Sequence, residues 1–251
     1  NQKGGVAKTT SVASIGAALA ELGQRVLLVD LDPQACLTFS LGIDPEDLEV
    51  SVHHVLTKGT DPREVIIETE DGVHLLPATI ELARAEADLL TRTGREHVVK
   101  MVVEDVEDDY DWVLLDCPPS LGVLTVAALT AARGVLIPLQ CETLSHRGVG
   151  QLLDTVHDVR RFTNRKLEVW GVLPTLYDGR TNHSRTVLET IAETYELEVV
   201  EPPIPKTIKF AEAPAAGRSI LATSRTSKGA QAYREVAEAA QANHGSRVEL
   251  W

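Results

Sequence analysis

The chain has 251 residues, of which 43% are hydrophobic and 24% are charged, so it can bury a large core. It contains no apolar run of about 18 residues, which excludes a membrane-spanning helix, and we expect no secretory signal. The formal net charge of −13 does not favour nucleic acid as a partner. The three cysteines lack C-x-x-C spacing, so we expect a reducing, cytoplasmic location without disulfide bonds or a zinc site.

The first predicted element is a glycine-containing loop that leads into a helix. Residues 2–10 read Gln-Lys-Gly-Gly-Val-Ala-Lys-Thr-Thr, and the apolar spacing that follows predicts a helix ending near Gly23. Gly4 and Gly5 let the backbone approach a polyphosphate closely. The N-terminus of the helix offers unpaired N–H groups and a positive dipole end, which suit an anion.

This loop departs from the ordinary nucleotide loop, G-x-x-x-x-G-K-[ST]. In that pattern the backbone and the lysine bind phosphate, and the hydroxyl binds Mg²⁺. Lys8 and Thr9 occupy the lysine and hydroxyl positions, whereas Gln2 and Ala7 replace the two glycines and Lys3 is an additional lysine. We predict that the loop binds a nucleotide through Gln2, Lys3, Gly4, Gly5, Val6, Ala7, Lys8, Thr9 and Thr10, with Thr9 also a metal ligand.

Strands and helices alternate along the rest of the chain. Apolar strands are predicted at 25–32, 112–119, 134–140 and 167–178, and helices near 80–106, 122–132, 145–162, 183–194 and 228–242. This order predicts a single α/β domain over residues 1–251, a doubly wound, mostly parallel sheet flanked by helices. We expect the strand that feeds the first loop to precede Asn1. Residues 42–72, rich in Pro, Gly and acids, predict an irregular insertion over the site.

Three aspartates stand where two of these strands end. Asp30 and Asp32 close the first strand, and Asp116 closes the second. Ligands of open α/β sheets bind at the carboxyl ends of the strands. A carboxylate there is suited to bind Mg²⁺ or its water shell, and another to orient an attacking water.

The loop K-G-G-x-x-K-T-T resembles the deviant P-loop of the ParA/MinD ATPases, and four later segments match that family in order. They are LLVDLDPQ, LLDCPPSLG, LYDGRT and AEAP. The resemblance implies a Mg²⁺-dependent ATP hydrolase of the ParA/Soj chromosome-partitioning type. It implies water activation by Asp32, metal binding by Asp30 and Asp116, and slow turnover raised by a ParB-like partner. It also implies an ATP-bound homodimer in which Lys3 reaches the partner's nucleotide, as an arginine finger does.

Two further groups of residues are carried over from the same resemblance. Pro205 and Thr207 match the segment that lines the adenine pocket in this family, and a helix N-cap at Pro-Lys-Thr is an equal alternative. Arg180 and Lys209 match positions that bind DNA without sequence preference, and Lys206 and Arg218 would widen that patch. Residues 203–234 hold six Lys or Arg against one acid, Glu212, which favours a locally basic face and a location at the nucleoid.

Three alternatives stay open at this point. A MinD-like membrane-associated ATPase needs a basic amphipathic C-terminal helix, whereas the Ala- and Glu-rich end here predicts no stable membrane association. An iron protein of the nitrogenase type needs cysteines paired around a cluster. An orphan ParA-like ATPase that positions or regulates other proteins would keep every nucleotide motif, so sequence does not separate it from a DNA-partitioning ATPase.

Overall fold

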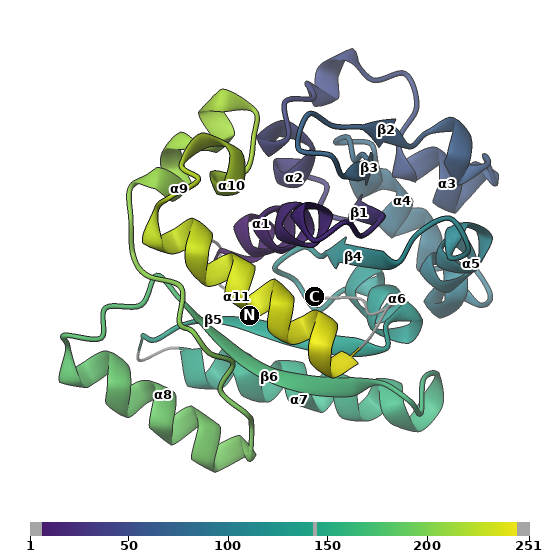
Figure 1. Ribbon diagram of the computed structural model, residues 1–251. Helices are drawn as coiled ribbons and strands as arrows, with labels where there is room; N and C mark the ends of the chain where they lie inside the picture. The colour runs from purple at the N-terminus through teal and green to yellow at the C-terminus, as the bar shows by residue number, and fades with distance from the viewer. Residues whose placement is uncertain (1–6, 143–144, 245–251) are drawn as a thin grey trace.

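Helices cover both faces of a layer of mostly parallel strands (Figure 1). The computed structural model describes residues 7–142 and 145–244. The loop residues Gln2, Lys3, Gly4, Gly5 and Val6 lie outside these ranges, so their predicted roles stay predictions. Within the described ranges, every helix is too short or too polar to cross a lipid bilayer.

The strands form two sheets. The first has the order β2 (Ile67–Glu68), β3 (His74–Leu76), β1 (Val26–Asp30) and β4 (Trp112–Asp116). β1 is parallel to β3 and β4, and only the short edge strand β2 runs antiparallel. The second sheet pairs β5 (Gly134–Gln140) with β6 (Glu168–Thr175) in parallel. All four predicted strands are therefore present, and the predicted fold class is confirmed.

The central strands are buried on both faces, which explains their continuous apolar sequences. Side chains of β1 alternate between two cores because successive strand residues point to opposite faces. Leu27 and Val29 join the core that contains α5 (Val98–Val106) and α6 (Val123–Ala131), whereas Val26 and Leu28 join the core beneath α1 (Lys8–Glu21). Two hydrophobic cores therefore enclose one sheet layer, as expected for a doubly wound domain.

The first core is covered by α3 (Val52–Lys58), α4 (Leu82–Leu89), α5 (Val98–Val106), α6 (Val123–Ala131), α7 (Ser145–Phe162) and α8 (Asn182–Tyr195). The second is covered by α1 (Lys8–Glu21), α2 (Cys36–Ser40), α9 (Lys209–Glu212), α10 (Ile220–Thr223) and α11 (Lys228–His244). α11, from the far end of the described chain, lies along α1 (Figure 1). The N-terminal helix therefore has C-terminal helices as neighbours.

Two sequence predictions are wrong in detail. The helix expected over 80–106 is divided into α4, a 3-10 turn at Arg95–His97 and α5, because Gly94 adopts a left-handed φ of 73° between them. Residues 42–72 are not an irregular cover over the site. They contain α3 and two 3-10 turns, Pro45–Asp47 and Pro62–Glu64, and α3 buries Val52, Val55 and Leu56 against α4 and α5.

Candidate functional site

A cavity of about 630 Å³ opens where β1 and β4 end. α1, α2 and the segment from α9 to α10 form its walls. Among the predicted site residues, Ala7, Lys8, Thr9, Thr10, Asp32 and Arg218 line it. No residue from 41 to 118 lines the cavity. This range includes 42–72, the segment that was expected to cover the site.

The ammonium group of Lys8 is buried at the start of α1 and has no hydrogen-bond partner among the described residues. Ala7 just before it has a left-handed φ of 64°, which turns the chain into the helix. Burial lowers the pKa of Lys8, and the nearby carboxylates of Asp116 and Asp32 oppose this effect. A buried, unpaired cation at a helix N-terminus is suited to bind an anion such as a phosphate.

Asp30 and Asp116 lie side by side because β1 and β4 are parallel and place these two residues in register. Asp30 is fully buried, and its carboxylate accepts three hydrogen bonds. Thr38 donates its main-chain N–H at 2.9 Å and its hydroxyl at 2.7 Å, and the N–H of Asp32 donates at 3.1 Å. Burial still raises the pKa of Asp30 above its ordinary value. Asp30 therefore joins the Asp32 loop to α2.

Asp116 is as buried as Asp30, but its carboxylate accepts fewer hydrogen bonds. Neither of its carboxylate oxygens accepts a hydrogen bond of acceptable geometry from a described residue. Burial raises the pKa of Asp116, and the charge of Asp30 raises it further, whereas the nearby Thr9 hydroxyl and Lys8 lower it. Unpartnered, buried carboxylate oxygens beside a threonine hydroxyl suit a hard divalent cation.

Asp32 lines the cavity from a tight turn that follows β1. Its carboxylate accepts a hydrogen bond from the N–H of Gln34 at 2.9 Å, and its carbonyl accepts one from the N–H of Ala35 at 2.8 Å. The side chain is half-buried and attracts Lys8 across the cavity. A carboxylate held in this way is able to orient a water molecule that approaches a phosphate bound by Lys8.

The described residues contain no cluster of three or more His, Cys, Asp or Glu side chains arranged to hold a metal ion by themselves. A Mg²⁺ ion would therefore depend on Thr9, Asp116 and the oxygens of a bound phosphate, which is how Mg²⁺ usually binds in nucleotide sites. Asp30 is the weaker candidate ligand, since three hydrogen bonds already occupy its oxygens.

Pro205 and Thr207 lie outside the lining of this cavity. Pro205 pairs with Tyr177 in a parallel bridge that extends the second sheet. The Thr207 hydroxyl accepts a hydrogen bond from the N–H of Lys209 at 3.3 Å, at the start of α9. The N-cap of α9 is Ile208, which makes no side-chain cap hydrogen bond, so the helix-cap alternative and the adenine assignment both stay predictions.

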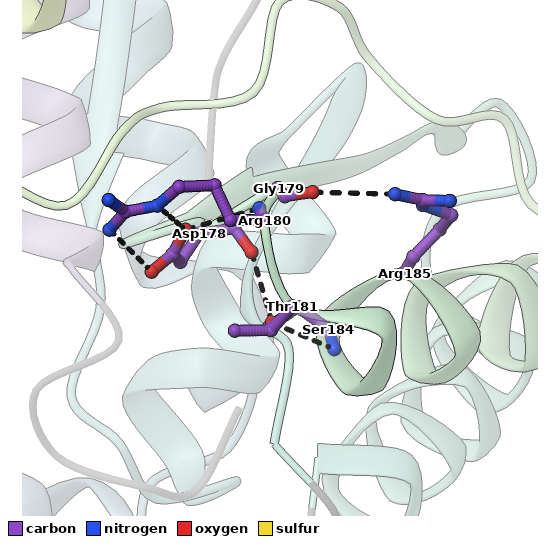
Figure 2. A network of polar contacts seen from close by, with 6 residues as sticks. All are labelled: Asp178, Gly179, Arg180, Thr181, Ser184 and Arg185. Carbon is purple, nitrogen blue, oxygen red and sulfur yellow. Dashed lines mark hydrogen bonds and ion pairs between the residues drawn. The ribbon is translucent and has the colours of Figure 1, made fainter.

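The predicted DNA-binding residues do not form one group. Arg180 is paired with Asp178, as Figure 2 shows, and its side chain is 90% exposed. Lys206 is exposed, and its main-chain N–H donates a hydrogen bond at 3.3 Å to the carbonyl of Tyr177, the residue before Asp178. Lys209 is exposed and paired with Glu212 at 2.8 Å. Arg218 is different, since it lines the cavity and pairs with Asp71 at 2.9 Å.

Several lining residues were missed by sequence reasoning. They include Phe39 and Ser40 from α2, and Phe210, Ala213, Pro214, Ser219 and Ile220 from the segment over α1. In the sequence, the segment around AEAP stands out only by its resemblance to a known family, because its apolar residues look like ordinary core residues. Their convergence on α2 depends on contacts between distant parts of the chain.

Comparison with known proteins gives consistent matches over the whole chain. A family model described as an AAA domain matches residues 1–169. The chain is 42% identical over 244 residues to the sporulation initiation inhibitor protein Soj of Bacillus subtilis, covering 97% of this chain and 96% of that protein. It is 43% identical over 238 residues to the chromosome-partitioning ATPase Soj of Thermus thermophilus, covering 95% and 92%.

A solved structure is more similar still. The chain is 56% identical to a protein from Mycobacterium smegmatis described as cobyrinic acid a,c-diamide synthase, crystallised with ADP and magnesium. The superposition has a TM-score of 0.87 and covers 99% of this chain and 95% of that one.

Proposed function

The chain belongs to the ParA/Soj family of chromosome-partitioning ATPases, and from this membership we propose that it is a Mg²⁺-dependent hydrolase of ATP. The observation that carries the proposal is the buried, unpartnered ammonium of Lys8, in a cavity shared with Asp32. The similar protein from Mycobacterium smegmatis, crystallised with ADP and magnesium, supports the choice of ligand.

Each residue has a separate task in this proposal. Lys8 and the N-terminus of α1 bind the phosphates, because both present positive charge to the cavity. Thr9 and Asp116 hold the metal, which offsets phosphate charge when it is bound. Asp32 orients the attacking water, and Asp30 holds the Asp32 loop and α2 in position through its three hydrogen bonds.

We place Lys3 in the homodimer that ATP induces. Lys8 already serves the nucleotide of its own subunit, so a second lysine in the same loop is available to the partner's nucleotide. A cation supplied across an interface stabilises charge that develops during phosphoryl transfer. In this role Lys3 affects hydrolysis much more than binding.

The test is nucleotide binding and phosphate release measured side by side. Lys8→Ala weakens binding of a fluorescent ATP analogue and abolishes turnover. Asp32→Ala and Lys3→Ala retain binding but reduce kcat by about 10²-fold or more, since each removes a group that acts in the transition state. Lys58→Ala, an exposed lysine of α3, is the control and keeps both properties. Unchanged turnover in Lys3→Ala would reject the role in trans.

We propose that the ATP-bound dimer binds DNA without sequence preference. A ParB-like partner then stimulates ATP hydrolysis. The exposed cations Arg180 and Lys206 support this reading. An orphan switch that positions proteins would share the same nucleotide chemistry, and so would a MinD-like ATPase that associates with membranes. Stimulation of phosphate release by DNA favours the partitioning reading, and stimulation by anionic vesicles favours the MinD-like one.

A second candidate function follows from the name of the similar Mycobacterium smegmatis protein, which is a diamide synthase. A synthase couples ATP cleavage to an acceptor molecule, so it turns over little ATP alone. Phosphate release in the absence of any carboxylate acceptor separates this candidate from a partitioning ATPase.

A further inference from the structure

The main chain of Asp32 is fastened to the sheet through the carboxylate of Asp30. The N–H of Asp32 donates a hydrogen bond of 3.1 Å to Oδ1 of Asp30, the last residue of β1. Asp30 is fully buried, so this bond is shielded from water. The position of the Asp32 loop at the cavity therefore depends in part on the direction in which the Asp30 carboxylate points.

The other oxygen of that carboxylate is held by Thr38. Oδ2 of Asp30 accepts the main-chain N–H of Thr38 at 2.9 Å and the Thr38 hydroxyl at 2.7 Å. The terminal torsion of an aspartate is broad, so an unheld carboxylate rotates easily. Two donors on one oxygen fix this rotation, and they leave Oδ1 aimed at the N–H of Asp32.

The hydroxyl of Thr38 is itself held in one direction. Its oxygen accepts a hydrogen bond from the N–H of Ala78 at 3.0 Å, just after β3. A threonine hydroxyl has one proton to donate and lone pairs that accept. Because Ala78 bonds to a lone pair, the proton is free to point at Asp30. Three segments, the end of β1, α2 and the chain after β3, therefore meet at one hydroxyl.

Thr38 supports the cavity without lining it. Its neighbours in α2, Cys36, Phe39 and Ser40, line the cavity. Thr38 faces the opposite way and is fully buried, with its hydroxyl on Asp30. Burying a hydroxyl costs free energy unless it is hydrogen-bonded, and this one both donates and accepts. Thr38 therefore acts on a bound ligand through Asp30 and Asp32 and not by direct contact.

We propose that Thr38 is a positioning residue for ATP hydrolysis: its hydroxyl fixes the Asp30 carboxylate and, through it, the main chain of Asp32, so that Asp32 is held where it orients the attacking water. This inference rests on the proposed function, which gives Asp32 that role. Misplacing a catalytic group by about 1 Å is enough to lower a rate by about 10²-fold. Binding of ATP depends instead on Lys8 and the start of α1, so Thr38 affects kcat and leaves the affinity for ATP unchanged.

The test measures kcat and the affinity for a fluorescent ATP analogue in a series of Thr38 variants. Thr38→Val keeps the shape of the side chain and removes the hydroxyl, so we expect kcat to fall by about 10-fold with unchanged affinity. Thr38→Ser returns the hydroxyl and recovers most of kcat. Thr38→Cys supplies only a weak donor and gives an intermediate kcat. The order of the variants therefore follows the strength of the donor.

Thr130→Val is the matched control, because it removes another buried threonine hydroxyl by the same change. Thr130 lies in α6 and is 2% exposed. Its hydroxyl donates to the carbonyl of Val126 at 2.8 Å and is 2.9 Å from the hydroxyl of Thr163. Urea denaturation gives the stability of each variant, and turnover is compared per folded protein. We expect Thr130→Val to lose stability and to keep kcat.

A double variant separates positioning from a general loosening of the fold. In Asp32→Ala the remaining turnover no longer depends on Asp32, so adding Thr38→Val causes no further loss in kcat. Adding Thr130→Val to Asp32→Ala shows the effect of lost stability alone. A further loss of about 10-fold in the Asp32→Ala, Thr38→Val protein contradicts the proposal, because Thr38 would then act by another route.

The proposal is also overturned if Thr38→Val keeps the kcat of the unaltered protein, or if Thr38→Ser has no more activity than Thr38→Cys. The comparison of Ser with Cys decides the matter even where Thr38→Val does not fold. Failure of the proposed function gives a different result, since Asp32→Ala by itself then keeps full turnover. Loss of turnover in Asp32→Ala with full turnover in Thr38→Val rejects only the role of Thr38.

Discussion

Asp30 and Asp116 are neighbours in space, but their carboxylates differ in the hydrogen bonds that they accept. Parallel pairing of β1 and β4 places them opposite each other, and both are buried. Three hydrogen bonds from Thr38 and Asp32 occupy Asp30, whereas Asp116 has none of acceptable geometry among the described residues. Of this pair, the carboxylate with unoccupied oxygens is better suited to bind a cation, because no protein hydrogen bond must be broken.

The ion pair between Arg180 and Asp178 makes the protein sensitive to acid pH. Hydrogen bonds from Arg180 lower the pKa of Asp178 from 3.8 to about 2 (Figure 2). Because the folded pKa lies below the unfolded one, the pair stabilises the fold above about pH 4 and loses this effect as pH falls toward 2. Arg180→Ala should return the pKa of Asp178 toward 3.8 in an NMR titration of its carboxyl carbon. An unshifted titration in the variant would contradict the pairing.

At the scale of elements, a pair of glycines joins α2 to the segment before α10. Gly42 follows α2 and Gly217 precedes Arg218, and both have left-handed φ, 83° and 64°. A Cβ added to Gly217 would lie 2.7 Å from the Cα of Gly42. Backbones that approach this closely couple the helix after the Asp32 loop to the segment that carries Ser219.

This contact predicts a strong effect of Gly217→Ala. We expect a loss of about 3 kcal/mol in the free energy of unfolding, because strain in φ adds to overlap with backbone atoms that have little room to move. Gly94→Ala is the matched control, since Gly94 also has a left-handed φ, 73°, but open space around its Cβ position. It should lose only about 1 kcal/mol. Equal midpoints in urea denaturation would show that the contact with Gly42 contributes nothing.

At the scale of the molecule, the proposed DNA binding opposes the overall charge. The chain carries −13, and three of the four predicted DNA-binding cations, Arg180, Lys209 and Arg218, are paired with acids of the chain. Binding to phosphates must therefore compete with internal ion pairs and with repulsion from the acidic body. Any affinity should depend on a local patch at Arg180 and Lys206 and should be sensitive to salt.

We expect ATP-dependent DNA binding that weakens by at least about 10-fold between roughly 50 and 200 mM salt. Arg180→Glu should weaken binding at low salt in a gel-shift assay. Arg63→Glu is the matched control, because it changes the net charge by the same amount at another exposed, acid-paired arginine, near α5. Equal losses in both variants would mean that net charge alone determines DNA binding.

The sequence determined the parts of this protein that depend on local patterns. Apolar runs predicted the four strands, because a strand buried on both faces needs continuous apolar residues. Chain order then placed Asp30, Asp32 and Asp116 at one edge of the sheet, and Lys8 at the start of the first helix. The family resemblance rested on the same short motifs, which is why it could be recognised without a structure.

The tertiary structure decided what those residues contact. Asp71 holds Arg218, 147 residues away in the chain, and so turns a predicted DNA-binding cation into part of a cavity wall. Thr38 donates two hydrogen bonds to Asp30, whereas the carboxylate of Asp116 accepts none of acceptable geometry from a described residue, which makes Asp116 the better candidate for a metal ligand. Phe39 and Ser219 meet in one cavity only because α2 and α10 pack on α1. Contacts of this kind depend on long-range packing, and the periodicity of a single segment carries no information about them.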